Sequence, residues 1–173
     1  MLNVAFWLSS CTSSAIRKIA PPLIVFKEQT MEKIDHPFVQ KFSDFWAAPT
    51  LEGVSTLVHD EAIFIQPLSK PLLTSEYHKY FKSVMKVSPD IHGEVIRYSE
   101  SENSNGLFIH WIMKFSIGSC QKEVSAVDII NLSGGKVTNR TVHMDLLPVL
   151  GSILIRPTVW FKWAKFILET SRL

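Results

Sequence analysis

A change of hydrophobic period near residue 90 constrains this chain more than any other feature of its sequence. Before the Ser88-Pro89-Asp90 stop, apolar residues recur every three or four positions, the spacing of one face of an α-helix. After the stop, apolar and polar residues alternate, which is the period of a half-buried strand. Helices first and strands second predict an α+β domain whose helices cover one face of a sheet.

The helical half predicts three helices and one early strand. The first helix, 36–48, carries aromatic residues at helical spacing, and Thr50 is suited to cap the second. Thr74 or Ser75 is expected to cap the third. Between the second and third helices, 61–67 is predicted to form a short strand. Pro67 ends it, because proline has no N–H to donate to a neighbouring strand.

The second half predicts strands over 92–99, 107–117, 123–132 and 136–145. Ser133-Gly134-Gly135 reads as a tight hairpin turn before the last of them. The expected result is a curved antiparallel or mixed sheet, closed by three N-terminal helices into a cone with a pocket inside.

The two ends of the chain differ from this domain. Residues 1–27 contain no acidic residue. Three interpretations stay open: an organelle leader, a secretory signal, or a true start at Met31, with 1–30 as upstream sequence or a disordered arm. At the other end, residues 148–173 are predicted to form a helical tail, in which Pro157 begins an amphipathic helix. Its Trp160, Trp163, Ala164 and Ile167 share one apolar face, which suits either packing on the domain or peripheral contact with a membrane.

The charge and the cysteine content of the chain limit which partners and which compartment we expect. A net charge of only +2 does not favour nucleic-acid binding. The charge is unevenly distributed, because residues 31–155 carry a net charge of −3 and residues 156–173 carry +3. Cys11 and Cys120 have no zinc-like or C-x-x-C spacing, which predicts reduced thiols, no metal site and an intracellular, cytoplasmic protein.

The stretches FSDFWAAPTLEGVSTLVHDEAIFIQP and VDIINLSGGKVTNRTVHMD resemble the opening and the closing hairpin of the SnoaL-like, or nuclear-transport-factor-two-like, superfamily. Asp60, Glu61, Ala62 and Pro67 match its acid-acid-Ala, strand, Pro pattern. The resemblance covers roughly 36–147, so a SnoaL-like domain over 31–147 is expected. It implies the cone fold, and a range of functions from ketosteroid isomerases, polyketide cyclases and limonene epoxide hydrolases to non-catalytic binding or dimerising modules.

Carried over by position, the resemblance supports only part of a steroid-isomerase site. Gln66 stands where the isomerases have their basic carboxylate, and Phe42 falls near their tyrosine. The buried acid of the isomerases matches Asp128; such an acid, kept protonated by an apolar site, can donate to an oxyanion. The resemblance to cyclases and epoxide hydrolases makes His143 and Asp145 acid/base candidates.

The polar residues leave two functional classes open. In the first, Asp128, His143 and Asp145 catalyse a cofactor-free proton transfer on a bulky, mostly apolar small molecule. In the second, the same cone is a non-catalytic ligand pocket or a dimerising surface, and a homodimer is expected in either case. We expect these residues to line the pocket: Phe42, Trp46, Gln66, Tyr77, His110 and Trp111.

Overall fold

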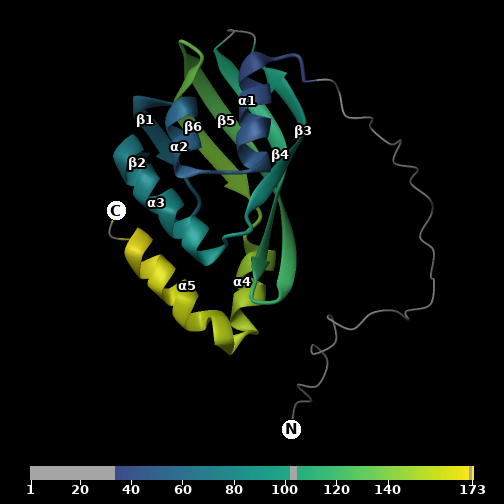
Figure 1. Ribbon diagram of the computed structural model, residues 1–173, viewed down its shortest axis with the longest axis vertical. Helices are drawn as coiled ribbons and strands as arrows, with labels where there is room; N and C mark the ends of the chain where they lie inside the picture. Colours follow the sequence, from purple (N-terminus) through teal and green to yellow (C-terminus); the bar gives the residue numbers. More distant parts are fainter. Residues whose placement is uncertain (1–33, 102–104, 172) are drawn as a thin grey trace, which may run out of the picture. The chain divides into compact units, whose positions relative to one another are not determined.

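The computed structural model describes residues 34–101, 105–171 and 173. The predicted leader or arm therefore lies outside the described residues. The described part is an α+β unit, as the change of period predicted, with helices on one face of a mixed sheet (Figure 1). None of its helices is long and apolar enough to cross a membrane.

Three helices and two strands form the first half. The helices are α1 (Pro37–Ala47), α2 (Leu51–Leu57) and α3 (Thr74–Val87), and the strands are β1 (Val58–Ile65) and β2 (Leu72–Leu73). The Thr50 hydroxyl caps α2 by accepting from the Gly53 N–H at 3.0 Å, as predicted.

The predicted cap of α3, Thr74 or Ser75, is wrong by one or two residues. Leu73 is the N-cap, and its N–H donates to the Glu76 carboxylate at 2.9 Å. The Thr74 hydroxyl instead joins α3 to β1, because it donates to the His59 carbonyl at 2.8 Å and accepts from the Ala62 N–H at 3.1 Å.

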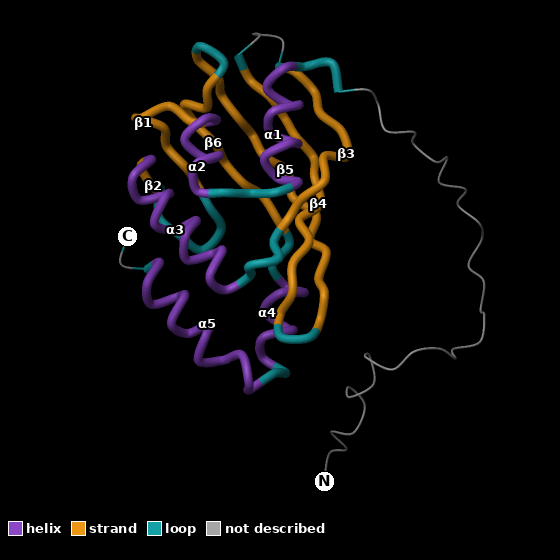
Figure 2. Tube along the Cα trace, viewed as in Figure 1, coloured by secondary structure: helices purple, strands orange, loops and turns teal. Residues whose placement is uncertain are grey.

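The second half is a four-stranded meander of β3 (His92–Glu100), β4 (Gly106–Ile117), β5 (Cys120–Ser133) and β6 (Lys136–Met144). With the two early strands it forms one six-stranded sheet in the order β2-β1-β6-β5-β4-β3 (Figure 2). Only the β1–β6 pair is parallel. Gly134 and Gly135 have φ of 58° and 74° in the turn between the paired Ser133 and Lys136, which confirms the predicted hairpin.

The C-terminal segment folds as two helices, α4 (Leu147–Leu154) and α5 (Pro157–Thr170), and Pro157 lies in the first turn of α5 as predicted. Helix α5 packs along α3 (Figure 1). Its packing face differs from the predicted stripe: Val159 is buried and Trp163 half-buried, whereas Trp160 and Ile167 are 50% and 55% exposed. The sheet thus has one face covered by helices, called the inner face below, and one open outer face.

Candidate functional site

A cavity of about 250 Å³ lies between the inner face of the sheet and the helices α3, α4 and α5. Most of its wall is apolar, with Ile91, Trp111 and Phe115 from the sheet side and Trp163 and Phe166 from α5. Cavities of this kind, largely apolar with a few polar groups, are typical small-molecule sites.

A buried ion pair supports one wall of this cavity. Asp128 on β5 is 0% exposed, and the Arg140 guanidinium on β6 donates from Nε to its Oδ2 at 2.7 Å, with Nη2 at 2.5 Å from the same oxygen. Trp111 Nε1 donates to Asp128 Oδ1 at 3.1 Å, and Arg140 Nη1 donates to the Tyr77 hydroxyl at 3.0 Å. Arg140 belongs to the cavity wall, whereas Asp128 lies behind it.

Strand register brings this pair together. Asp128 faces Val142 across the β5–β6 pair, and Ile130 faces Arg140. The two charged residues are therefore diagonal neighbours on the inner face, within reach of long side chains. Trp111 on β4 is also a diagonal neighbour of Asp128, because in the β4–β5 pair Trp111 faces Ala126 and Asp128 faces Ile109.

The charges of the pair follow from these contacts. Burial raises the pKa of Asp128, and Arg140 opposes that rise. Among the described residues, the side chains that hydrogen-bond the Asp128 carboxylate are N–H donors, so the site accommodates its ionised form. For Arg140, burial acts to lower the pKa, but Asp128 and Tyr77 raise it, so the guanidinium stays charged.

Aromatic rings complete the surroundings of the guanidinium. Its central carbon lies 5.5 Å from the Phe42 ring centroid and 5.6 Å from that of Trp46. Burial raises the pKa of the Tyr77 hydroxyl, and it raises that of Tyr80, another cavity residue, to about 12. Both phenols therefore keep their protons at neutral pH.

Two polar side chains of the cavity wall have a buried donor without a partner. In the described part of the chain, the buried side-chain nitrogens that lack a hydrogen bond are Trp46 Nε1, Gln66 Nε2 and His110 Nδ1. The first two belong to residues of the cavity wall, and Gln66 is only 8% exposed. An unsatisfied buried donor costs about 1–3 kcal/mol, so a ligand oxygen that accepts a hydrogen bond from either nitrogen would offset that cost.

Four of the predicted pocket residues do line the cavity: Trp46, Gln66, Tyr77 and Trp111. Phe42 lines a smaller neighbouring cavity of about 20 Å³. The placement of His110 was wrong. It lies on the outer face beside Ser125, whose hydroxyl is 2.9 Å from His110 Nε2. The reason is alternation: neighbours on a strand point to opposite faces, and Trp111 takes the inner one.

The other two candidate acid/base residues do not meet Asp128 in the cavity. His143 is exposed and pairs with Val127 on the outer face of the sheet. Asp145 lies beyond the end of β6, where its carboxylate accepts from the Leu147 N–H at 3.0 Å at the start of α4. Neither residue is part of the cavity wall.

Arg140 is the central residue that the sequence analysis did not select. The spacing along the strands was a signal that could have found it. Arg140 shares a face of β6 with Val142 and Met144, which are two and four positions away. Asp128 likewise shares a face of β5 with Ala126 and Ile130. Opposite charges at inner positions of neighbouring apolar strands indicate a buried pair. Among the described residues, no group of three or more potential ligands could hold a metal ion.

Comparison with known proteins agrees with the fold. The SnoaL-like domain model matches residues 39–140, more than half of the chain. The chain belongs to the SnoaL-like domain family. No curated protein sequence matches this SnoaL-like domain significantly.

Solved structures show the same fold at low sequence identity. PrhC from Penicillium brasilianum is 13% identical with a TM-score of 0.65, over 77% of this chain and 95% of that one. IdmH from Streptomyces antibioticus, a proposed polyketide cyclase, is 10% identical with a TM-score of 0.59, over 68% and 98%. A steroid delta-isomerase from Pseudomonas aeruginosa is 19% identical with a TM-score of 0.51, over 66% and 82%.

Proposed function

We propose that this SnoaL-like domain binds a bulky, largely apolar small molecule that carries a ketone or another acceptor oxygen. The observation that carries the proposal is the unpartnered Gln66 Nε2 in the wall of an apolar cavity of about 250 Å³. The names of two neighbours in structure, a steroid isomerase and a proposed polyketide cyclase, refer to ligands of this chemical class.

The arrangement favours binding over proton transfer by the three candidate residues. Asp128 is held by Arg140 and Trp111 behind the wall, while His143 and Asp145 lie outside it. The cavity instead offers donors that do not change charge near neutral pH: the Gln66 amide, the Trp46 indole and the Arg140 guanidinium. Such donors orient an acceptor oxygen and need no cofactor.

Binding of the naphthalene ketone prodan tests the proposal, with 2-dimethylaminonaphthalene, which lacks the ketone, as the comparison ligand. We expect Gln66→Leu to weaken prodan binding by roughly two- to twelvefold, because a single hydrogen bond contributes about 0.5–1.5 kcal/mol. The same substitution should leave binding of the ketone-free compound unchanged or stronger. Fluorescence titration measures both constants.

His110→Leu is the matched control, because His110 Nδ1 is also a buried nitrogen without a partner but belongs to the outer face. It should not alter prodan binding. Equal effects of the two substitutions, or no binding of either compound to the parent protein, would contradict a ligand cavity at Gln66.

A second candidate function, self-association, rests on the outer face of the sheet. Five large apolar side chains there are 37–43% exposed: Ile63, Ile65, Phe108, Val127 and Ile129. Register places Phe108 opposite Ile129 on the neighbouring strand, so several members form one patch. We propose that this face pairs with a second copy of the chain, since contiguous apolar patches mark protein interfaces.

Sedimentation equilibrium tests the pairing. The parent chain should form a dimer, and Phe108→Lys should dissociate it, because two copies of the new charge would face each other across a self-complementary interface. A monomeric parent chain, or a dimer that Phe108→Lys leaves intact, would exclude this face as the contact.

A further inference from the structure

Helix α5 is apolar on more than the side that contacts its own domain. Its inner side is formed by Val159, Trp163 and Phe166, of which the last two line the cavity. Away from the cavity it carries three large side chains with high exposure: Trp160 at 50%, Phe161 at 84% and Leu168 at 57%. Packing on the domain therefore accounts for only part of the apolar surface of this helix.

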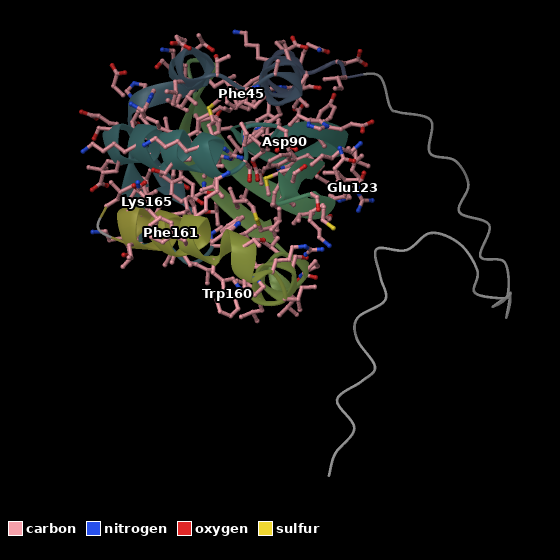
Figure 3. All side chains as sticks on the ribbon, turned by 60° about the horizontal axis from the view of Figure 1, so that its bottom comes forward. Phe45, Asp90, Glu123, Trp160, Phe161 and Lys165 are labelled. Carbon is pink, nitrogen blue, oxygen red and sulfur yellow. The ribbon has the colours of Figure 1, made fainter. Side chains whose placement is uncertain are left out.

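Helix α4 extends the same apolar surface. Leu147, Leu154 and Ile155, in α4 and at its C-cap, are 76%, 69% and 68% exposed. Helices α4 and α5 lie together at one end of the domain (Figure 1). Trp160 Nε1 donates to the Ile153 carbonyl at 2.8 Å and so ties the two helices together. Figure 3 places Trp160, Phe161 and Lys165 along α5, at the end of the domain opposite Phe45 of α1.

The charge of this region favours an anionic partner. Residues 156–173 carry four basic residues and one acidic residue, whereas 31–155 carry a net charge of −3. Lys162 and Lys165 are exposed on α5. Glu169 is the one acidic residue of 156–173, and its Oε1 lies 3.9 Å from Lys165 Nζ. A second copy of the same surface would bring like charges together, which disfavours self-association here.

We propose that the outer sides of α4 and α5 dock on the surface of an anionic lipid bilayer. Exposed leucine, isoleucine, phenylalanine and tryptophan side chains would enter the boundary between headgroups and acyl chains, while Lys162 and Lys165 contact the anionic headgroups. The Trp160 ring adds apolar area at this boundary, and its indole N–H already has a partner in the Ile153 carbonyl.

The docking surface and the cavity share one helix. Trp163 and Phe166 of α5 face the cavity, and Phe161 and Leu168 face outward. A bilayer on the outer side would therefore lie about one helix diameter, roughly 10 Å, from the cavity. The docking itself does not require the cavity to bind a ligand, so the two proposals can fail separately.

Co-sedimentation of the full chain with vesicles tests the docking. We expect binding to vesicles of phosphatidylcholine and phosphatidylserine, and weaker binding at high salt or to phosphatidylcholine alone. Phe161→Ser should weaken binding by roughly tenfold or more, because it removes a ring that would be buried among lipids. Lys162→Gln and Lys165→Gln should each weaken binding to the anionic vesicles by about fivefold.

Leu73→Ser is the control, because Leu73 is an apolar side chain that is 56% exposed on β2, at the edge of the sheet, and belongs to neither proposed contact surface. It should bind vesicles as the parent chain does. The proposal is overturned if the parent chain does not bind anionic vesicles at low salt, or if Phe161→Ser binds as well as Leu73→Ser. A dimer that Phe161→Ser disrupts, without vesicle binding, would assign the surface to self-association. Loss of prodan binding with vesicle binding intact would reject only the cavity.

Discussion

The inner and outer faces of β5 and β6 are built from alternating residues of the same two strands, yet they have opposite properties. The inner face holds Asp128 and Arg140 in a buried ion pair, whereas the outer face exposes Val127, Ile129 and His143. Two charged residues of these strands are thus buried among apolar neighbours, while two apolar residues are left in contact with solvent. Burial of such a pair requires partners for each charged group, and Trp111 and Tyr77 supply them.

This difference indicates where each face is constrained. The inner face must keep its charges paired, its rings packed and its cavity open. The outer face is free to vary unless another molecule covers it. The predictions below compare the two faces, from the largest expected effect to the smallest.

Breaking the inner ion pair should have the largest effect on stability. Arg140→Met leaves the Asp128 carboxylate buried without its counter-ion, and we expect the free energy of unfolding to fall by about 3–5 kcal/mol. His143→Ala, on the outer face, should change it by less than about 0.5 kcal/mol. Urea denaturation measures both.

The double substitution Asp128→Leu with Arg140→Met separates pairing from packing. It should recover most of the stability lost in Arg140→Met, because no unpaired charge remains buried. A loss below about 1 kcal/mol in Arg140→Met would show that the pair does not constrain the inner face.

Close packing on the inner face predicts the second effect. A Cβ atom at Gly93 on β3 would lie 2.7 Å from two ring carbons of Trp111 and 3.3 Å from the Trp46 Cβ. Gly93→Ala should therefore lower the free energy of unfolding by about 1–3 kcal/mol. Ser99→Ala, at an exposed position of the same strand, serves as the control and should have little effect on thermal unfolding.

Two adjacent residues of β5 provide the sharpest comparison of the faces. Ile130 is 0% exposed on the inner face, and Ile129 is 37% exposed on the outer one. Measured at a protein concentration low enough for the chain to be monomeric, Ile130→Val should cost about 1 kcal/mol, and Ile129→Val less than half of that. The cost of Ile129→Val should rise with protein concentration if a second copy covers the outer face.

The smallest effect concerns a proton on the outer face. Partial burial, and then the positive charge of Arg97 on the neighbouring strand, lower the pKa of His110. Protonation therefore favours the unfolded chain, and the stability contributed by neutral His110 is present above its unfolded pKa and lost as the pH falls through its folded pKa. Arg97→Gln should raise the pKa of His110 and reduce that loss. A titration of the imidazole NMR signals measures the shift; an unchanged or lower pKa would contradict it.

The features that the sequence predicted correctly depend on local rules. The Thr50 cap, the Gly134-Gly135 turn and the proline start of α5 each follow from the conformational preferences of one or two residues. Alternation along β5 explains why Asp128 is buried while Val127 and Ile129, on either side of it, face outward. The same rule would have excluded either His110 or Trp111 from the cavity, because adjacent residues of one strand cannot both point inward.

The features that the sequence missed depend on contacts between distant segments. Arg140 contacts Tyr77, 63 positions earlier, and Asp128, 12 positions earlier. Nothing within a few residues of Arg140 encodes those partners, because they arise from the register of β5 on β6 and the docking of α3. Strand alternation would put Asp145 on the same face as His143, but β6 ends at Met144 and α4 begins at Leu147, so Asp145 is not part of the strand.

By itself, the sequence determined the fold class, the order of the elements and the SnoaL-like resemblance, because period, caps and turns are properties of neighbouring residues. Only the tertiary structure decided which polar residues share a space. It placed Arg140 and Gln66 in the cavity wall, turned His110 and His143 outward, and divided the apolar surface of α5 between the cavity and the exterior. Those outcomes depend on strand register and helix docking, which join residues that are far apart along the chain.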